Sequence, residues 1–183
     1  MAREQRQFTV LMRFFHWLTA ALVLTMLGIG VAMVASLADY HLLVSIHRPL
    51  GILILIVVVI RYVNRRYSTL PPFPATMSAQ ERSIASASEI LLYSLLFLLP
   101  LVGWGMLSAA RFPIVLYGAF HLPPILPHNV MLYALLRRTH TVLAYLLFAA
   151  FLAHIGAVLF HTLLVRDGLF SRMAPWRDRA RQG

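Results

Sequence analysis

The stretch from residue 139 to residue 165 constrains the fold more than any other part of the chain. It holds 27 residues, none of which is Asp, Glu, Lys or Arg. About 20 such residues in an α-helix suffice to cross the hydrocarbon core of a bilayer. The stretch also contains His140, His154 and His161. Ionisable side chains inside a membrane are costly and usually mark a functional path.

These three histidines share one face of the expected helix. At about 100° per residue, the steps from His140 to His154 end within about 40° of the same direction and about 21 Å further along the axis. His161 lies seven residues beyond His154 and returns to that face. One helix therefore presents imidazoles near both membrane surfaces to the same interior.

The composition is that of an all-α integral membrane protein, with 60% hydrophobic and 12% charged residues. The chain contains no cysteine, which excludes disulfides, iron–sulfur clusters and covalent c-type haem attachment. All 16 basic residues are arginines, and they give a net charge of +10. Arginines at the ends of membrane spans set topology, so we expect no nucleic-acid partner.

The distribution of charges predicts one membrane domain over residues 1–183, with four spans. The expected spans are residues 14–37, 42–64, 88–110 and 138–165. Ser78 and Glu81 form the pattern of a capping box, so a helix is expected to begin there and lead into the third span. Residues 111–137 contain four prolines, which argue against a further span. We expect an outer loop there, lying on the membrane surface, with room for one short interfacial helix.

Four spans place 12 of the 16 arginines on the side that holds both termini. The positive-inside bias predicts that this side is cytoplasmic. The outer side then carries only Arg48, Arg111, Arg137 and Arg138.

This topology puts four histidines at two depths. His16 and His154 fall in the inner half, and His47 and His140 fall near the outer face. Two pairs at two depths are the arrangement needed to hold two haems, each iron bound axially by two imidazoles in a bundle interior. A lone interfacial histidine is more often a hydrogen-bonded structural residue, and histidines 41, 121 and 128, in the expected loops, keep that interpretation.

Several segments together resemble the prokaryotic cytochrome b561 family over nearly the whole chain. They are RFFHWLTA, SIHRPLGILILIVVVIRYVNR, LLPLVGWGM, RRTHTVLAYLLFAAFLAH and LFHTLLVRDGLFSRM. The resemblance implies a four-helix bundle with two b-type haems in the bacterial inner membrane, exchanging electrons with ubiquinone. It implies that His16, His47, His140 and His154 are the axial ligands, and it associates His161 with the quinone site. One characterised member of the family is a superoxide oxidase.

Two functions follow as expectations. The first is a superoxide:ubiquinone oxidoreductase that takes electrons from the outer side. The alternative is a quinol-linked cytochrome b anchor that exchanges electrons with a separate dehydrogenase or soluble carrier, because the family also resembles the membrane subunits of hydrogenases and formate dehydrogenases.

Arginines near the histidines have two possible roles. Arg48, Arg137 and Arg138 adjoin the outer pair, and Arg61 lies at the foot of the second span; each would bind haem propionates or steer anions. Arg65 and Arg66 are candidates, with His161, for the quinone site. The alternative for His161 is that it only anchors the helix end at the interface.

Overall fold

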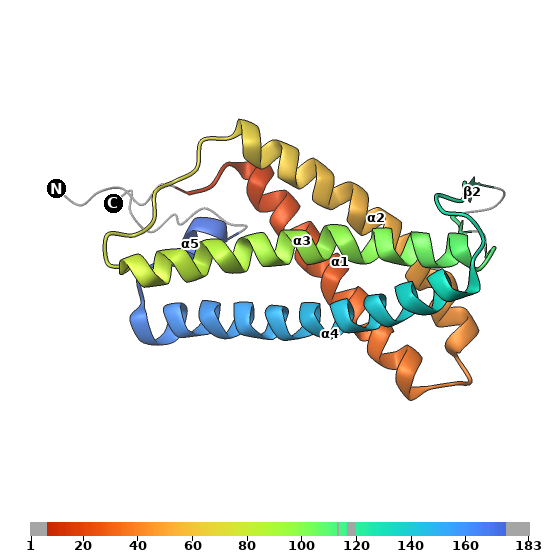
Figure 1. Ribbon diagram of the computed structural model, residues 1–183. Helices are drawn as coiled ribbons and strands as arrows, with labels where there is room; N and C mark the ends of the chain where they lie inside the picture. Colours follow the sequence, from red (N-terminus) through yellow and green to blue (C-terminus); the bar gives the residue numbers. More distant parts are fainter. Residues whose placement is uncertain (1–6, 113, 117–119, 175–183) are drawn as a thin grey trace.

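The computed structural model describes residues 7–112, 114–116 and 120–174 (Figure 1). In chain order its elements are α1 (Val10–Ala35), α2 (Tyr40–Tyr67), α3 (Ala79–Ala109), β1 (Ile114–Val115), β2 (His121–Leu122), α4 (Val130–Phe160), the π-helix η1 (His161–Val165) and α5 (Leu169–Met173). Four helical segments, the last being α4 continued by η1, are long and apolar enough to cross a membrane. The expected mostly helical fold with four candidate membrane spans is confirmed.

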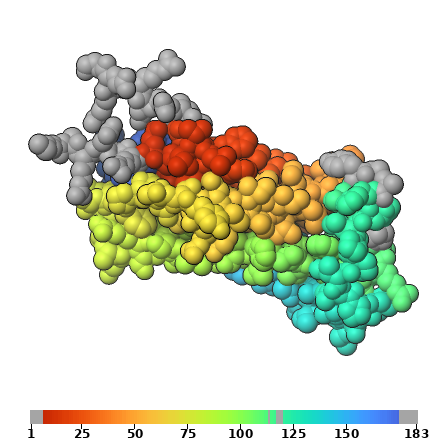
Figure 2. Space-filling model, turned by 90° about the horizontal axis from the view of Figure 1, so that it is seen from above, coloured from red at the N-terminus to blue at the C-terminus, as the bar shows by residue number. Residues whose placement is uncertain are grey.

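The long helices form two antiparallel pairs. α1 packs along α2, α3 packs along α4, and contacts between α2 and α3 join the pairs (Figures 1 and 2). Between the pairs lies a core cluster of Val23, Ile54, Val58, Leu95, Leu96, Leu99 and Leu147. In lipid, helix association depends on close side-chain packing rather than on exclusion of water, so this cluster fixes the helices relative to one another.

We name the two ends of the bundle by their smaller elements. The hairpin end holds β1 and β2, which pair antiparallel with Ile114 opposite Leu122. The α5 end holds the start of α1, the end of α2, the start of α3 and η1 (Figure 1).

Helix α3 begins where the capping box predicts. Ser78 Oγ accepts a hydrogen bond from the Glu81 N–H at 3.2 Å, and Glu81 Oε2 accepts one from the Ser78 N–H at 2.7 Å. The helix has 31 residues, which corresponds to about 46 Å and exceeds a hydrocarbon core of about 30 Å. Its first turns therefore extend beyond the core.

Helix α4 begins at Val130, eight residues before the expected span, because Asn129 caps it through a hydrogen bond from the Leu132 N–H at 2.9 Å. The loop expected over residues 111–137 therefore ends at residue 129, and its last eight expected residues belong to α4. Within its described part, the loop forms the β1–β2 ladder where we allowed for an interfacial helix.

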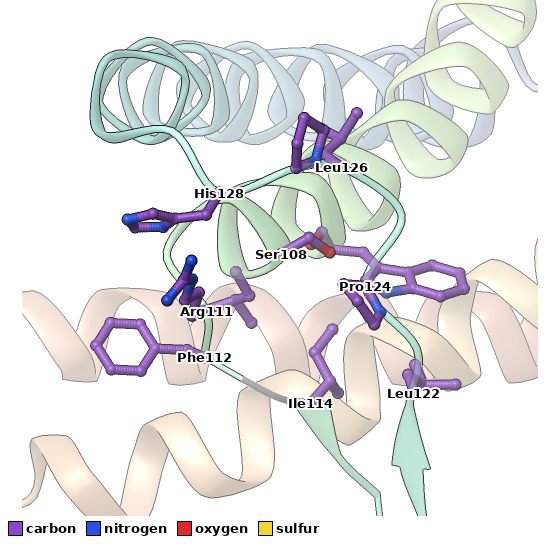
Figure 3. Close-up of a pocket in the computed structure, with 11 residues that line it drawn as sticks. Ser108, Arg111, Phe112, Ile114, Leu122, Pro124, Leu126 and His128 are labelled. Carbon is purple, nitrogen blue, oxygen red and sulfur yellow. The ribbon is translucent and has the colours of Figure 1, made fainter.

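Three hydrogen bonds that involve side chains tie the loop to the end of α3. Trp104 Nε1 donates to the Pro123 carbonyl at 2.9 Å, Ser108 Oγ accepts from the Ile125 N–H at 3.1 Å, and His128 Nδ1 donates to the Ala109 carbonyl at 2.8 Å. A cavity of about 410 Å³ lies between the loop and α3. Figure 3 shows Arg111 and His128 at one side of it and Leu122 and Pro124 at the other.

At the α5 end, the chain folds back across the start of α1. The Phe8 N–H donates to the Arg172 carbonyl at 3.1 Å, and Trp17 Nε1 donates to the Met173 carbonyl at 2.8 Å. The buried Arg13 donates to the Ala174 carbonyl at 2.9 Å. These bonds fix the segment that follows η1 against the bundle.

Candidate functional site

The structure brings together His47 of α2 and His140 of α4 at the hairpin end. Their ring centroids are 6.3 Å apart, with 69° between the ring planes. Both Nδ1 atoms are buried and make no hydrogen bond of good geometry within the described part of the chain. Buried polar atoms are normally satisfied, so such an exception asks for an explanation.

The separation of these imidazoles suits a shared metal. Histidine nitrogens bind metals at about 2 Å, and adding about 1 Å from each nitrogen to its ring centre gives about 6 Å between the two centroids. Two imidazoles are also the donor set of a six-coordinate haem iron. The pair therefore fits a haem held between α2 and α4.

Gly103 of α3 makes room for the His140 ring. A Cβ at this position would lie 3.3 Å from His140 Cε1, which is tighter than ordinary van der Waals contact, and 3.5 Å from His140 Nδ1, which is within the ordinary range. The backbone of Leu99, one turn earlier, interacts with His140. No supporting residue on α3 was predicted from the sequence, where the only signal is the glycine at position 103 in the segment VGWG.

The α5 end holds a second pair, His16 of α1 and His154 of α4, which lie close enough to interact electrostatically. Arg61 of α2 lies with them, its Nη2 3.0 Å from His16 Nδ1. The Arg61 guanidinium also lies 5.1 Å from the ring centre of Tyr93, within the range of a cation–π contact.

The bond between Arg61 and His16 limits how His16 can bind a metal. A guanidinium only donates, so His16 Nδ1 accepts and a neutral ring carries its proton on Nε2. Nε2 can bind a metal only when its lone pair is free, so the proton would have to move from Nε2 to Nδ1. This pair therefore fits a haem iron only if Arg61 turns away from His16, and a propionate is a suitable new partner for it.

The two arginines expected at the quinone site, Arg65 and Arg66, lie in the last turn of α2. Arg65 forms a salt bridge with Glu89 of α3 at 2.7 Å, and Arg66 is exposed. Glu89 was not predicted as the partner of Arg65, because a pairing between two helices leaves no local signal in the sequence.

The arginines at the hairpin end are not equivalent. Arg48 interacts electrostatically with His47. Both Arg137 and Arg138 are exposed, and at about 100° per residue Arg137 lies about 60° and Arg138 about 160° around α4 from His140. Arg138 therefore faces away from the histidine pair, and it can act there only through its long-range field.

At the α5 end, His161 is paired. Its Nδ1 lies 2.7 Å from Oδ2 of Asp167, and the Asp167 side chain is only 2% exposed. His161 was expected at this end, but Asp167 was not predicted as its partner, because their contact depends on the π-turn between them.

A four-helix membrane bundle with an imidazole pair near each end defines a class of protein, one that can hold redox-active metal groups between its helices. The comparisons agree with this class. A family model described as prokaryotic cytochrome b561 matches residues 7–176. The chain belongs to this family: it is a multi-pass membrane electron-transfer protein of the four-helix, haem-binding type, and the family implies b-type haem.

Two relatives from Escherichia coli (strain K12) carry corresponding names. Cytochrome b561 homolog 2 is 36% identical over 124 residues, which cover 66% of this chain and 65% of that protein. Cytochrome b561 homolog 1 is 27% identical over 171 residues, which cover 90% of this chain and 94% of that protein. The match to the first relative thus spans slightly less than two thirds of its length.

Proposed function

We propose that the protein carries electrons across the bacterial inner membrane through two haem b groups. His47 and His140 would hold one at the hairpin end, and His16 and His154 would hold the other at the α5 end. Each haem would supply an iron that gains and loses one electron. The proposal rests chiefly on the 6.3 Å separation of the His47 and His140 rings. Two imidazoles at this separation would both hold the iron and would so disfavour the binding of other ligands to it.

The excess of positive charge at the hairpin end suggests an anionic electron donor. Arg48, Arg111, Arg137 and Arg138 lie there, and Asp39 is the acidic residue at this end within the described ranges. A positive field raises the encounter rate of small anions. We therefore take superoxide as the donor and the hairpin end as the periplasmic side, with the α5 end and both termini cytoplasmic.

Ubiquinone would be the acceptor, bound beside His161 at the α5 end. The reaction balances as two superoxide ions plus ubiquinone plus two protons, giving two dioxygen molecules and ubiquinol. Electrons enter at the hairpin end, and protons are taken up at the α5 end.

Two measurements test this function. The purified protein should show a reducible b-type α-band, and it should reduce ubiquinone-1 when xanthine oxidase generates superoxide, with superoxide dismutase as the control that abolishes the reaction. A missing α-band would overturn the haem proposal. Two results together would favour the anchor function over the oxidase function. They are reduction of the haem by ubiquinol without superoxide-dependent quinone reduction, and a soluble subunit that copurifies stoichiometrically.

A further inference from the structure

His161 and Asp167 form a dyad at the point where α4 ends. Besides the 2.7 Å contact between His161 Nδ1 and Asp167 Oδ2, the other carboxylate oxygen, Oδ1, accepts the Leu169 N–H at 3.0 Å. The Asp167 side chain is 2% exposed, whereas that of His161 is 15% exposed. The carboxylate is thus buried with partners on both oxygens, and the imidazole retains an accessible edge.

The backbone is shaped to make this contact. The last turn before Arg166 is a π-turn, in which the Arg166 N–H donates to the His161 carbonyl at 2.7 Å. Arg166 then adopts a left-handed conformation with φ 54°, and Gly168 follows with φ 75°. A non-glycine residue at positive φ is uncommon, and π-turns occur often at functional sites. The chain uses both features to return Asp167 to His161.

The contact with Asp167 determines which nitrogen of the His161 ring is available to a quinone. An ionised carboxylate only accepts, so His161 Nδ1 donates to it and carries a proton. In the neutral ring, Nε2 then has a free lone pair and cannot donate a hydrogen bond to a quinone carbonyl. In the protonated ring, Nε2–H can donate, and the buried carboxylate stabilises the resulting imidazolium. This is the relation between histidine and aspartate in a Ser-His-Asp triad.

We propose that Asp167 is a positioning residue that makes His161 the proton carrier of the quinone site. The inference rests on the proposed quinone function of the α5 end. Reduction of the quinone takes two electrons and two protons. For each proton, His161 Nε2–H protonates a quinone oxygen, and the neutral ring then takes a replacement from water at the cytoplasmic surface. In the reverse direction the Nε2 lone pair accepts a proton from ubiquinol.

Glu81 of α3 lies close to this dyad from the neighbouring helix, where it interacts electrostatically with both His161 and Asp167. Its carboxylate accepts the Ser78 N–H in the capping box. Two carboxylates, one from α3 and one from the segment after η1, therefore lie near the His161 ring.

The test is Asp167→Asn in the full-length, haem-loaded protein. Asparagine keeps the size of the side chain, and its oxygen can still accept the Leu169 N–H. It cannot stabilise an imidazolium, and its amide group would face His161 Nδ1 as a donor. We expect haem content and the KM for ubiquinone-1 to stay within about twofold, while kcat falls at least about 10-fold. The variant keeps His161 and so loses only part of the about 100- to 10,000-fold that general acid–base catalysis contributes. Asp167→Glu should recover part of kcat.

Asp39→Asn is the matched control, because it removes one carboxylate charge at the opposite end of the bundle. Its rate of haem reduction by ubiquinol-1, which does not depend on the field that acts on superoxide, should equal that of wild type. Reduction of the haem by ubiquinol-1, followed at the α-band, is the second assay, and it works whether or not superoxide is the donor. If wild-type protein exchanges electrons with ubiquinone in neither assay, the proposed quinone function fails. If wild-type protein is active and Asp167→Asn retains full kcat, or loses its haem, the proton-carrier role fails.

Discussion

Replacement of Gly103 should weaken haem binding at the hairpin end without unfolding the bundle. In Gly103→Ala the new methyl would lie 3.3 Å from His140 Cε1, so the ring must shift by a few tenths of an ångström. Overpacking of this kind costs about 1 to 3 kcal/mol, and about 1.4 kcal/mol corresponds to a tenfold change in affinity. We expect the hairpin-end haem to bind about tenfold more weakly in Gly103→Ala, and more weakly still in Gly103→Val.

The assay is transfer of haem from the purified protein to apomyoglobin, followed by absorbance. Wild-type protein should release both haems slowly, whereas Gly103→Ala should release about half of its haem in a faster phase. Because alanine favours a helix over glycine by about 1 kcal/mol, the thermal stability of the haem-free protein should not fall.

Gly156→Ala provides the matched control. It changes a glycine of α4 two residues after His154, and a Cβ there would meet nothing within 4 Å. Haem release from this variant should match wild type. If Gly103→Val keeps both haems with wild-type release kinetics, Gly103 does not shape the His140 site, and the haem does not depend on the observed ring position.

Two further predictions concern the arginines. Arg61→Gln should lower the midpoint potential of the α5-end haem, because it removes a positive charge that disfavours oxidised iron. We expect a decrease of about 60 mV, equivalent to a tenfold shift of a one-electron equilibrium. A redox titration that shows no change or a rise in this potential would contradict the prediction. The Arg137→Gln/Arg138→Gln double variant should keep both haems and should flatten the salt dependence of superoxide-driven quinone reduction, because these charges act over a screening length of about 10 Å at 0.1 M salt. A wild-type rate that is indifferent to salt would argue against anion steering.

The sequence alone was sufficient for the parts of this structure that depend on local pattern. Charge-free segments predicted the four long helices, and Ser78 with Glu81 predicted where α3 begins. Helical periodicity and alternating span direction grouped His47 with His140, and the structure brings those rings together.

The supporting residues depended on contacts between distant segments. Gly103 matters only because α3 packs against the ring of a residue on α4, and Asp167 reaches His161 only through a π-turn that no propensity pattern indicates. The four prolines argued against a further span, and the described residues contain four candidate spans. The prolines gave no indication of the Asn129 cap that starts α4 early. The sequence also gives no indication that Arg61 contacts His16, because the orientation of the Arg61 side chain depends on its surroundings in the bundle interior.

Haem stoichiometry is the measurement on which the assignment of two histidine pairs to two haems depends. A pyridine haemochrome assay, normalised to protein by quantitative amino-acid analysis, should give two haem b per wild-type chain. The four single variants His16→Ala, His47→Ala, His140→Ala and His154→Ala should each give one, and the loss in His47→Ala should match that in His140→Ala in both spectrum and potential. Haem content that is unchanged in all four variants, or variants of one pair that lose different haems, would contradict the pairing.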